Sequence, residues 1–286
     1  MPLLGLPALL RPLPADPLAR RDPEFLRAQL PVVERLIRAW FAPELTGLEH
    51  LECTPALIVG MHNGGPMVPD GYAFVAAAMR HLGLDRPLYF LGHDLVFLLP
   101  VVGRWIALCG GVPATPGNAL ALLGRGHPVL VYPGGELDAY KPFARRHQVV
   151  LDERAGFVRV ALAAQVPIVP VVSVGAHQSW YVLTDGRALA GRLGLGHGHL
   201  RLKTLPVALS LPWGISVGHV TPYLPIPSRV RVRVLPPIDP GLPAAAAADP
   251  EAVLAVRARV LAAMQAAVDA MVAEGGFGLR ARLRCV

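Results

Sequence analysis

Charged residues are scarce in this chain of 286 residues. They make up 16%, whereas hydrophobic residues make up 53%, and the mean hydropathy is +0.45. No apolar window reaches the ~18–20 residues that cross a bilayer, since the nearest, residues 87–112, is interrupted by His93, Asp94, Pro100 and Arg104. The formal net charge is nevertheless +7. An apolar and basic chain without a spanning segment indicates contact with an anionic membrane surface.

Cysteines and aromatic residues are also few. Cys53, Cys109 and Cys285 show no metal-type spacing, so neither a disulfide framework nor a zinc site is indicated and a reducing cytoplasm fits. Aromatic residues make up 6% and do not alternate with the arginines, which argues against nucleic acid as a partner. The apolar run within the first fourteen residues has no basic residue before it and no small-residue cleavage site, so it makes a poor signal peptide. We therefore expect a cytoplasmic protein, peripheral or monotopic at the inner face of the membrane.

Three short apolar runs predict the core of the fold. Residues 55–61, 127–133 and 166–175 lack polar alternation, which is typical of strands covered on both faces of a parallel sheet. Helical patterns at 71–82, 118–123 and 152–164 separate them. The sequence therefore predicts a single α/β domain with a mainly parallel mixed sheet flanked by helices, and loops at the carboxyl ends of the strands as the place for ligands.

The flanking segments complete the predicted organisation. Asp22, Pro23 and Glu24 predict the start of an amphipathic helix that ends near Phe41. Residues 176–214 indicate surface loops and short helices, or a lipid-facing flap, and the alternation at 229–234 predicts a half-exposed edge strand. A last helix is expected from about residue 250 to 273. We divide the chain into an N-terminal apolar and basic segment (1–21), the main domain (22–240), and a C-terminal helix with a basic tail (241–286).

The stretch after the first apolar run carries the strongest chemical signal. His62 follows the predicted strand directly, and Asn63, Gly64 and Gly65 leave the backbone bare for a bulky thioester or ester. Such a histidine can act as a general base, and Asp70 can orient its ring. Asp70 can equally cap the helix that follows it. A metal site including His93 and Asp94 is conceivable, but nothing in the spacing requires a metal.

The motif order resembles one family. HNGGPMVPD, VYPGGE, ERAGFVRVALAAQVPIVPVVSVG, LPWG and VRVLPPI follow one another as in the lysophospholipid (glycerolipid) acyltransferase superfamily, and the Pro-Gly-Gly block is similar to its bacterial and diacylglycerol-acyltransferase-like branch. The resemblance implies transfer of a fatty acyl group from acyl-CoA or acyl-carrier protein, as co-substrate and with no other cofactor, to a lipid hydroxyl. The acceptor would be a lysophospholipid or a mono- or diacylglycerol. It implies His62 as general base and Asp70 as its support, with no metal.

Further substrate-binding residues are expected from the same resemblance. They lie in the loops that follow the predicted strands: Asn63, Gly64, Gly65, Pro133, Gly134, Gly135, Glu136, Lys141, Arg145, Arg146 and Arg154. Glu136 either binds an acceptor hydroxyl or anchors its loop. Lys141, Arg145 and Arg146 either bind a phosphate or form a solvated basic loop. The chain departs from the superfamily at two places, because the arginine of its usual phosphate-binding block is missing and seven residues, not four, separate His62 from Asp70.

Two other classes of protein compete with this interpretation. A lipase of the α/β-hydrolase type needs a Gly-x-Ser-x-Gly elbow, and no serine of the chain lies in one. A non-catalytic lipid-binding protein at the membrane would use the same apolar and basic surface. The pairing of His62 with Asp70 favours the enzyme over both.

Overall fold

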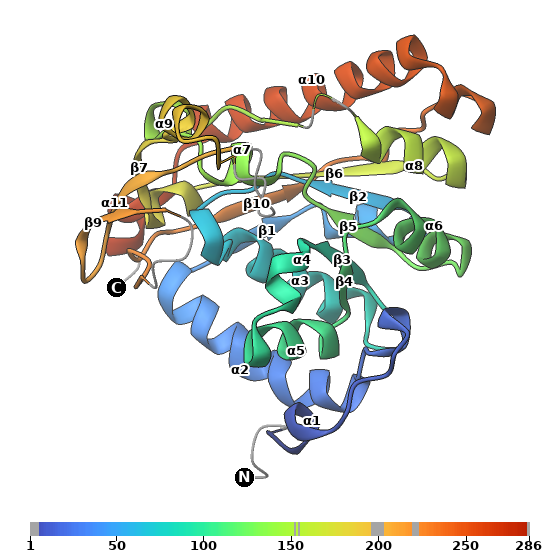
Figure 1. Ribbon diagram of the computed structural model, residues 1–286, viewed down its shortest axis with the longest axis horizontal. Coiled ribbons are helices and arrows are strands. Elements are labelled where there is room, and N and C mark those ends of the chain that lie inside the picture. Colours follow the sequence, from blue (N-terminus) through green and yellow to red (C-terminus); the bar gives the residue numbers. More distant parts are fainter. Residues whose placement is uncertain (1–5, 152, 154, 196–202, 219–222, 285–286) are drawn as a thin grey trace.

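The computed structural model describes residues 6–151, 153, 155–195, 203–218 and 223–284 (Figure 1). Seven strands form one sheet in the order β1-β10-β6-β2-β5-β3-β4. Their bounds, in that order, are Glu44–Thr46, Arg231–Val234, Ile168–Val174, Leu57–Gly60, Val129–Val131, Tyr89–Gly92 and Gly111–Pro113. The five strands from β6 to β4 are parallel, while β10 pairs antiparallel with β6 and parallel with β1. The fold is therefore α/β with a mainly parallel mixed sheet, as predicted.

Helices cover both faces of this sheet (Figure 1). Those named in the argument below are α1 Leu6–Leu10, α2 Pro23–Phe41, α3 Pro69–Leu82, α4 Asp94–Phe97, α5 Pro100–Leu108, α6 Pro116–Gly124, α7 Gly135–Ala139, α8 Gly156–Ala164, α9 Arg187–Arg192, α10 Pro250–Glu274 and α11 Gly278–Leu283. Helices α6, α8 and α10 contribute to one buried cluster, and α2, α3 and α5 to the other. Along β2, Leu57 and Val59 belong to the first cluster and Ile58 to the second. The continuous apolar runs thus reflect burial on both faces.

The helix and the strands predicted from the clearest sequence patterns are confirmed. Asp22 caps α2 through bonds from the backbone N–H groups of Glu24 and Phe25, and the helix ends at Phe41. The three apolar runs form β2, β5 and β6, which are neighbours in the sheet. Residues 87–112 form β3, α4, α5 and the start of β4. No helix in the described part of the chain is long and apolar enough to cross a membrane.

Two predictions from weaker patterns are wrong. The alternating segment at 229–234 supplies β10, which is an interior strand because β1 pairs with its outer side. Arg231 lies between two carboxylates, 3.2 Å from Glu44 and 2.9 Å from Glu274. The arginines of this segment therefore form ion pairs with neighbouring elements and do not mark a solvated edge of the sheet.

The segment 176–214, expected to hold only loops and short helices, does contain the short helix α9 but also contributes to a second sheet. Strands β7 (Tyr181–Thr184), β8 (Val207–Ser210) and β9 (Gly214–Val217) form this small antiparallel sheet. Its inner face packs Val182 and Ala208 against Ala139 and Tyr140. The small sheet is thereby fixed to the segment that follows β5.

The C-terminal helix α10 is part of the main core, since Val260, Met264 and Val268 are fully buried. Met264→Ala should therefore lower the free energy of unfolding by about 2–5 kcal/mol, because it leaves a cavity in the core. Leu254 on the same helix is 51% exposed. Leu254→Ala should change stability by less than about 0.5 kcal/mol. Urea denaturation measures both, and equally small effects would mean that α10 is a detachable appendage.

Candidate active site

The loops that follow β2, β5 and β6 meet at one edge of the large sheet, as predicted for parallel strands. The loop after β2 contains His62, the loop after β5 leads into α7, and the loop after β6 contains His177. Contacts between them are direct, because the His62 N–H donates to Asp138 and His177 bonds the Lys141 carbonyl. Residues far apart in the sequence therefore build one site.

The His62 side chain is partly exposed, and its ring stacks on Tyr132 with 4.5 Å between the ring centroids. The Nδ1 atom is buried and has no hydrogen-bond partner. Burial, together with the charge of Lys141, lowers the pKa of His62 to about 4. The imidazole is consequently neutral at pH 7, which is the form that accepts a proton.

A buried ion pair holds the backbone of His62. The Asp138 carboxylate accepts the His62 N–H at 2.5 Å, and the Lys141 ammonium donates to the His62 carbonyl at 3.1 Å. Lys141 and Asp138 lie 2.5 Å apart, with side chains 1% and 0% exposed. Both polar groups of one residue are thus fixed by charged partners, which form stronger hydrogen bonds than neutral groups do. We call this arrangement the Asp138–Lys141 clamp.

His177 extends the clamp to the glycine loop. Its Nδ1 accepts from the Gly64 N–H at 3.4 Å, so the ring proton lies on Nε2 and is donated to the Lys141 carbonyl at 2.6 Å. Burial and the charge of Lys141 lower the pKa of His177 to about 3, which keeps this neutral tautomer. His177 therefore connects the loops after β2 and β5.

The two glycines after Asn63 are required by the local geometry. Gly64 and Gly65 have φ angles of +81° and +66°, which favour glycine. A Cβ atom on Gly64 would lie 2.8 Å from the Ala176 carbonyl oxygen, and one on Gly65 would lie 2.2 Å from the Trp180 ring. Protein atoms thus fill the space beside these glycines, whereas the sequence suggested that this space is open to substrate. Their contact with substrate stays a prediction.

Asp70 lies in the first turn of α3, which begins at Pro69 with Val68 as its N-cap residue. The expectation that Asp70 precedes the helix is therefore wrong. Within the described chain no hydrogen bond joins Asp70 to His62. The Ser173 hydroxyl donates to Asp70 Oδ2, while Oδ1 is buried without a hydrogen-bond partner. The 3-10 turn at Gly65–Met67 takes up the longer spacing between the two residues.

Asn63 and Tyr132 complete the surroundings of Asp70. The Asn63 amide donates to the Ser173 hydroxyl at 2.8 Å and to the Ser173 carbonyl at 3.2 Å. The Tyr132 hydroxyl would lie 3.1 Å from a Cβ atom on Gly71, so this ring reaches from His62 to the start of α3. Tyr132 and Ser173 were missed from the sequence. The one signal for Tyr132 was its place at a strand end, directly before the Pro-Gly-Gly block.

The Pro-Gly-Gly-Glu block turns the chain from β5 into α7. A Cβ atom on Gly134 would lie 2.1 Å from the Val150 carbonyl oxygen, so only glycine fits after Pro133. Gly135 follows with a φ angle of +52°. The Glu136 carboxylate accepts from the Lys203 N–H at 2.6 Å and from the Thr204 hydroxyl at 3.2 Å. Glu136 therefore anchors its loop, which is one of the two roles considered for it. Its contact with an acceptor hydroxyl stays a prediction.

The predicted phosphate-binding cations are not equivalent in the structure. Lys141 is buried in the clamp, so a solvated loop does not describe it. Arg145 pairs with Asp185 at 3.0 Å and is 43% exposed. The Arg146 guanidinium lies 4.3 Å from the centre of the Phe143 ring and donates to the Phe143 carbonyl. Arg154 lies outside the described residues. A role of these four residues in binding phosphate stays a prediction.

His93 and Asp94 do not join the site. The His93 side chain caps α4 by accepting the Leu95 N–H at 3.2 Å. In the described part of the chain, no group of three or more His, Cys, Asp or Glu side chains is placed to hold a metal ion.

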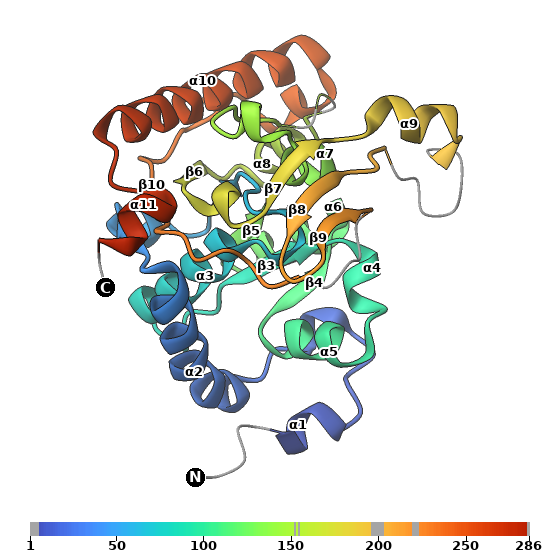
Figure 2. The same cartoon turned by 90° about the vertical axis from the view of Figure 1, so that its left-hand side faces the viewer.

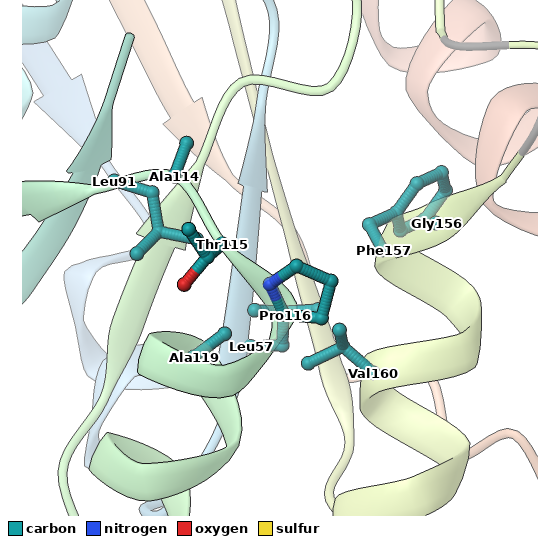
Figure 3. A pocket seen from close by; sticks show the side chains of 9 residues that line it. All are labelled: Leu57, Leu91, Ala114, Thr115, Pro116, Ala119, Gly156, Phe157 and Val160. Carbon is teal, nitrogen blue, oxygen red and sulfur yellow. The ribbon is translucent and has the colours of Figure 1, made fainter. Parts of the chain in front are cut away.

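An apolar cavity of about 110 Å³ lies between α6 and α8 (Figure 3). Leu57 and Phe157, which line it, belong to the core cluster of α6, α8 and α10. Tyr132, which stacks on His62, packs against the cluster on the opposite face. The cavity and the His62 ring are therefore on different faces of the sheet.

Comparison with known proteins indicates an acyltransferase. Residues 42–174 match the family model named Acyltransferase. An uncharacterized protein of Mycobacterium tuberculosis is 31% identical over 218 residues, which cover 76% of this chain and 58% of that protein. The "DGAT1/2-independent enzyme synthesizing storage lipids" of Gallus gallus is 27% identical over 191 residues, which cover 66% of this chain and 54% of that enzyme. The match thus spans little more than half the length of these relatives.

A solved structure shares the fold. The crystal structure of the 1-acyl-sn-glycerophosphate acyltransferase PlsC from Thermotoga maritima aligns with a TM-score of 0.54 and 17% identity, over 94% of this chain and 87% of that one. Residues 42–174 thus match the Acyltransferase family, and the storage-lipid relative and the shared fold support the glycerolipid acyltransferase superfamily.

The clamp predicts a large stability effect at one residue. Lys141→Met should lower the free energy of unfolding by about 3–5 kcal/mol, because it leaves the Asp138 carboxylate buried without its counter-ion. Adding Asp138→Leu should recover much of that loss. Glu34→Ala breaks an exposed pair with Arg80 and should cost at most about 1 kcal/mol. Urea denaturation checks all three, and a cost for Lys141→Met as small as that for Glu34→Ala contradicts a buried clamp.

Asp70 predicts a pH dependence of stability. Burial raises its pKa from 3.8 to about 7, so the folded state holds the proton more tightly than the unfolded state. The resulting stabilisation is complete below about pH 4 and is lost as the pH rises through 7. Asp70→Asn removes this dependence, so the variant should gain stability relative to the wild type between pH 4 and pH 8. Urea denaturation at several pH values measures this, and a constant difference would contradict the raised pKa.

Proposed function

We propose that this protein is an O-acyltransferase that moves a fatty acyl group from acyl-CoA or acyl-carrier protein to a lipid hydroxyl, with His62 as general base. The observation that carries the proposal is the neutral His62 imidazole, whose backbone is held by the Asp138–Lys141 clamp. A neutral base at a fixed position suits the removal of a hydroxyl proton at pH 7. The match to the Acyltransferase family supports the reaction class.

The reaction needs one base and no acyl-enzyme intermediate. His62 takes the proton of the acceptor hydroxyl while the acceptor oxygen attacks the thioester carbonyl. The tetrahedral intermediate collapses, the C–S bond breaks, and the proton passes from the imidazolium to the departing thiolate. The products are an ester and a free thiol.

Asp70 supports the imidazolium in this proposal. Both His62 Nδ1 and Asp70 Oδ1 are buried without a hydrogen-bond partner, and such atoms are costly unless they are paired at some stage of function. We propose that they pair when substrate is bound. With a pKa of about 7, a large fraction of Asp70 is already ionised at neutral pH, and this carboxylate would stabilise the positive charge formed on His62.

The acceptor and the location follow from the same reasoning. We propose a glycerolipid acceptor of the lysophospholipid or mono- or diacylglycerol type, at the inner face of an anionic membrane. The name of the Gallus gallus relative supports an acceptor used in storage lipids, and the net charge of +7 supports an anionic surface.

The catalytic role of His62 is tested by thiol release from acyl-CoA with a panel of mono- and diacylglycerols and lysophospholipids. His62→Ala should lower the rate roughly 10²–10⁴-fold, the contribution of a positioned general base, without unfolding the protein. His93→Ala is the matched control, since it removes a histidine that caps α4, and it should keep wild-type turnover. Near wild-type transfer by folded His62→Ala would rule out this base. No thiol release by the wild type with any acceptor would favour a non-catalytic lipid-binding protein.

A further inference from the structure

The small sheet β7-β8-β9 has an apolar outer face. Tyr181, Leu209 and Ile215 are cross-strand neighbours in one row, and their exposed fractions are 36%, 41% and 65%. The same face continues through other exposed apolar residues, namely Leu183, Leu211, Trp213 and Val217. Contiguous apolar patches larger than a few hundred Å² are rare on soluble monomers, so this face indicates an interaction surface.

The alternation of inward and outward side chains along these strands distinguishes this face from an ordinary solvated face of a sheet. Ala208, Ser210 and Ser216 point inward and are buried, while Leu209 and Ile215 point outward. An antiparallel sheet with one solvated face normally carries polar residues at the outward positions. Here the outward positions carry large apolar residues instead, while the inward ones hold Val182 and small residues. Packing within the chain therefore does not explain why the outward side chains of this sheet are apolar.

Cations lie at one end of the same sheet. Helix α9 follows β7 (Figure 2). The exposed Arg187, Leu189 and Arg192 lie on this helix, and the exposed Leu193 directly follows it. Lys203, which is also exposed, leads into β8. Asp185, an acidic residue of this region, pairs with Arg145 at 3.0 Å and with Arg187 at 3.8 Å, and the Arg187 side chain remains 53% exposed. Apolar side chains bordered by cations match an anionic lipid surface, where acyl chains take up the former and phosphates attract the latter.

The sheet is also connected to the site. On the inner side of the sheet lies Trp180, which approaches Gly65 in the His62 loop and stacks on Tyr223 with 5.3 Å between the ring centroids. The Tyr223 hydroxyl donates to the Gly64 carbonyl at 2.7 Å. A lipid surface against the outer face would therefore lie close to the loop that holds the proposed base.

We propose that the outer face of β7-β8-β9, with α9, is the surface by which this protein docks on an anionic bilayer. Leu209 and Ile215 enter the acyl-chain boundary, and Arg187, Arg192 and Lys203 meet lipid phosphates. The inference rests on the proposed function for its biological meaning, because a docked sheet presents a lipid acceptor to His62. The binding itself is measured independently of catalysis.

The experiment is flotation of the full chain with vesicles of phosphatidylcholine containing 30% phosphatidylglycerol, compared with vesicles of phosphatidylcholine alone. Leu209→Glu/Ile215→Glu should weaken binding to the anionic vesicles at least tenfold, and Leu209→Ser/Ile215→Ser should weaken it to a smaller degree. Leu254→Glu, at a residue of similar exposure on α10, is the matched control and should bind as the wild type does. Thermal unfolding verifies that each variant is folded.

A second exposed apolar patch is the alternative surface for binding the membrane. Leu98, which directly follows α4, and Val101, on α5, are 73% and 67% exposed. If Leu98→Glu/Val101→Glu abolishes flotation while the sheet variants float normally, the proposal is overturned. It is equally overturned if the wild type does not bind anionic vesicles, or if the sheet variants act only by dissociating a dimer of this chain in solution.

Catalysis is followed separately, by thiol release from a short-chain acyl-CoA and a water-soluble acceptor without vesicles. Sheet variants that keep this activity but lose flotation support the docking surface. A wild type that floats through this sheet yet releases no thiol would refute the proposed function and leave the docking surface standing.

Discussion

The buried ion pair between Asp138 and Lys141 holds the candidate site together. It bonds both the N–H and the carbonyl of His62, and it belongs to the segment that follows the Pro-Gly-Gly turn. Burying two charges is costly unless each finds good partners. Here the partners are each other and the backbone of the proposed base. The two buried charges therefore fix the position of His62, and the charge of Lys141 also helps to keep the His62 ring neutral.

The remaining contacts arrange themselves around this clamp. His177 joins Lys141 to Gly64, and Trp180 packs against Gly65. The Ser173 hydroxyl, which accepts from the Asn63 amide, donates to one oxygen of Asp70, while the other oxygen and His62 Nδ1 have no hydrogen-bond partner. Val68, just before α3, has a φ of +39°, which is strained for a β-branched residue. Rigid support of His62 is thus combined with unsatisfied and strained groups at Asp70, a distribution that is typical of functional sites.

Sequence patterns predicted the parts of the fold that depend on local periodicity. The apolar runs gave β2, β5 and β6, and the capping signal at Asp22 gave the start of α2. Strands β7 to β9 were missed because they are four residues long and lie in a glycine-rich segment, so tertiary packing on Tyr140 and Ala139 decides their conformation. His62 was identifiable from its glycine loop. Lys141 was interpreted as an exposed cation because its burial depends on the contact with His62, although Asp138 three residues earlier was a usable signal.

The lowered pKa of His62, which keeps its ring neutral, is the central claim, and nuclear magnetic resonance titration of its imidazole tests it most directly. The ten histidines give overlapping signals, so the His62 signal is assigned by its loss in His62→Ala. The account predicts a pKa of about 4, with Lys141→Met raising it because one nearby positive charge is removed. A wild-type pKa near the ordinary value of 6.5 would contradict both the buried environment of the ring and the influence of the clamp on it.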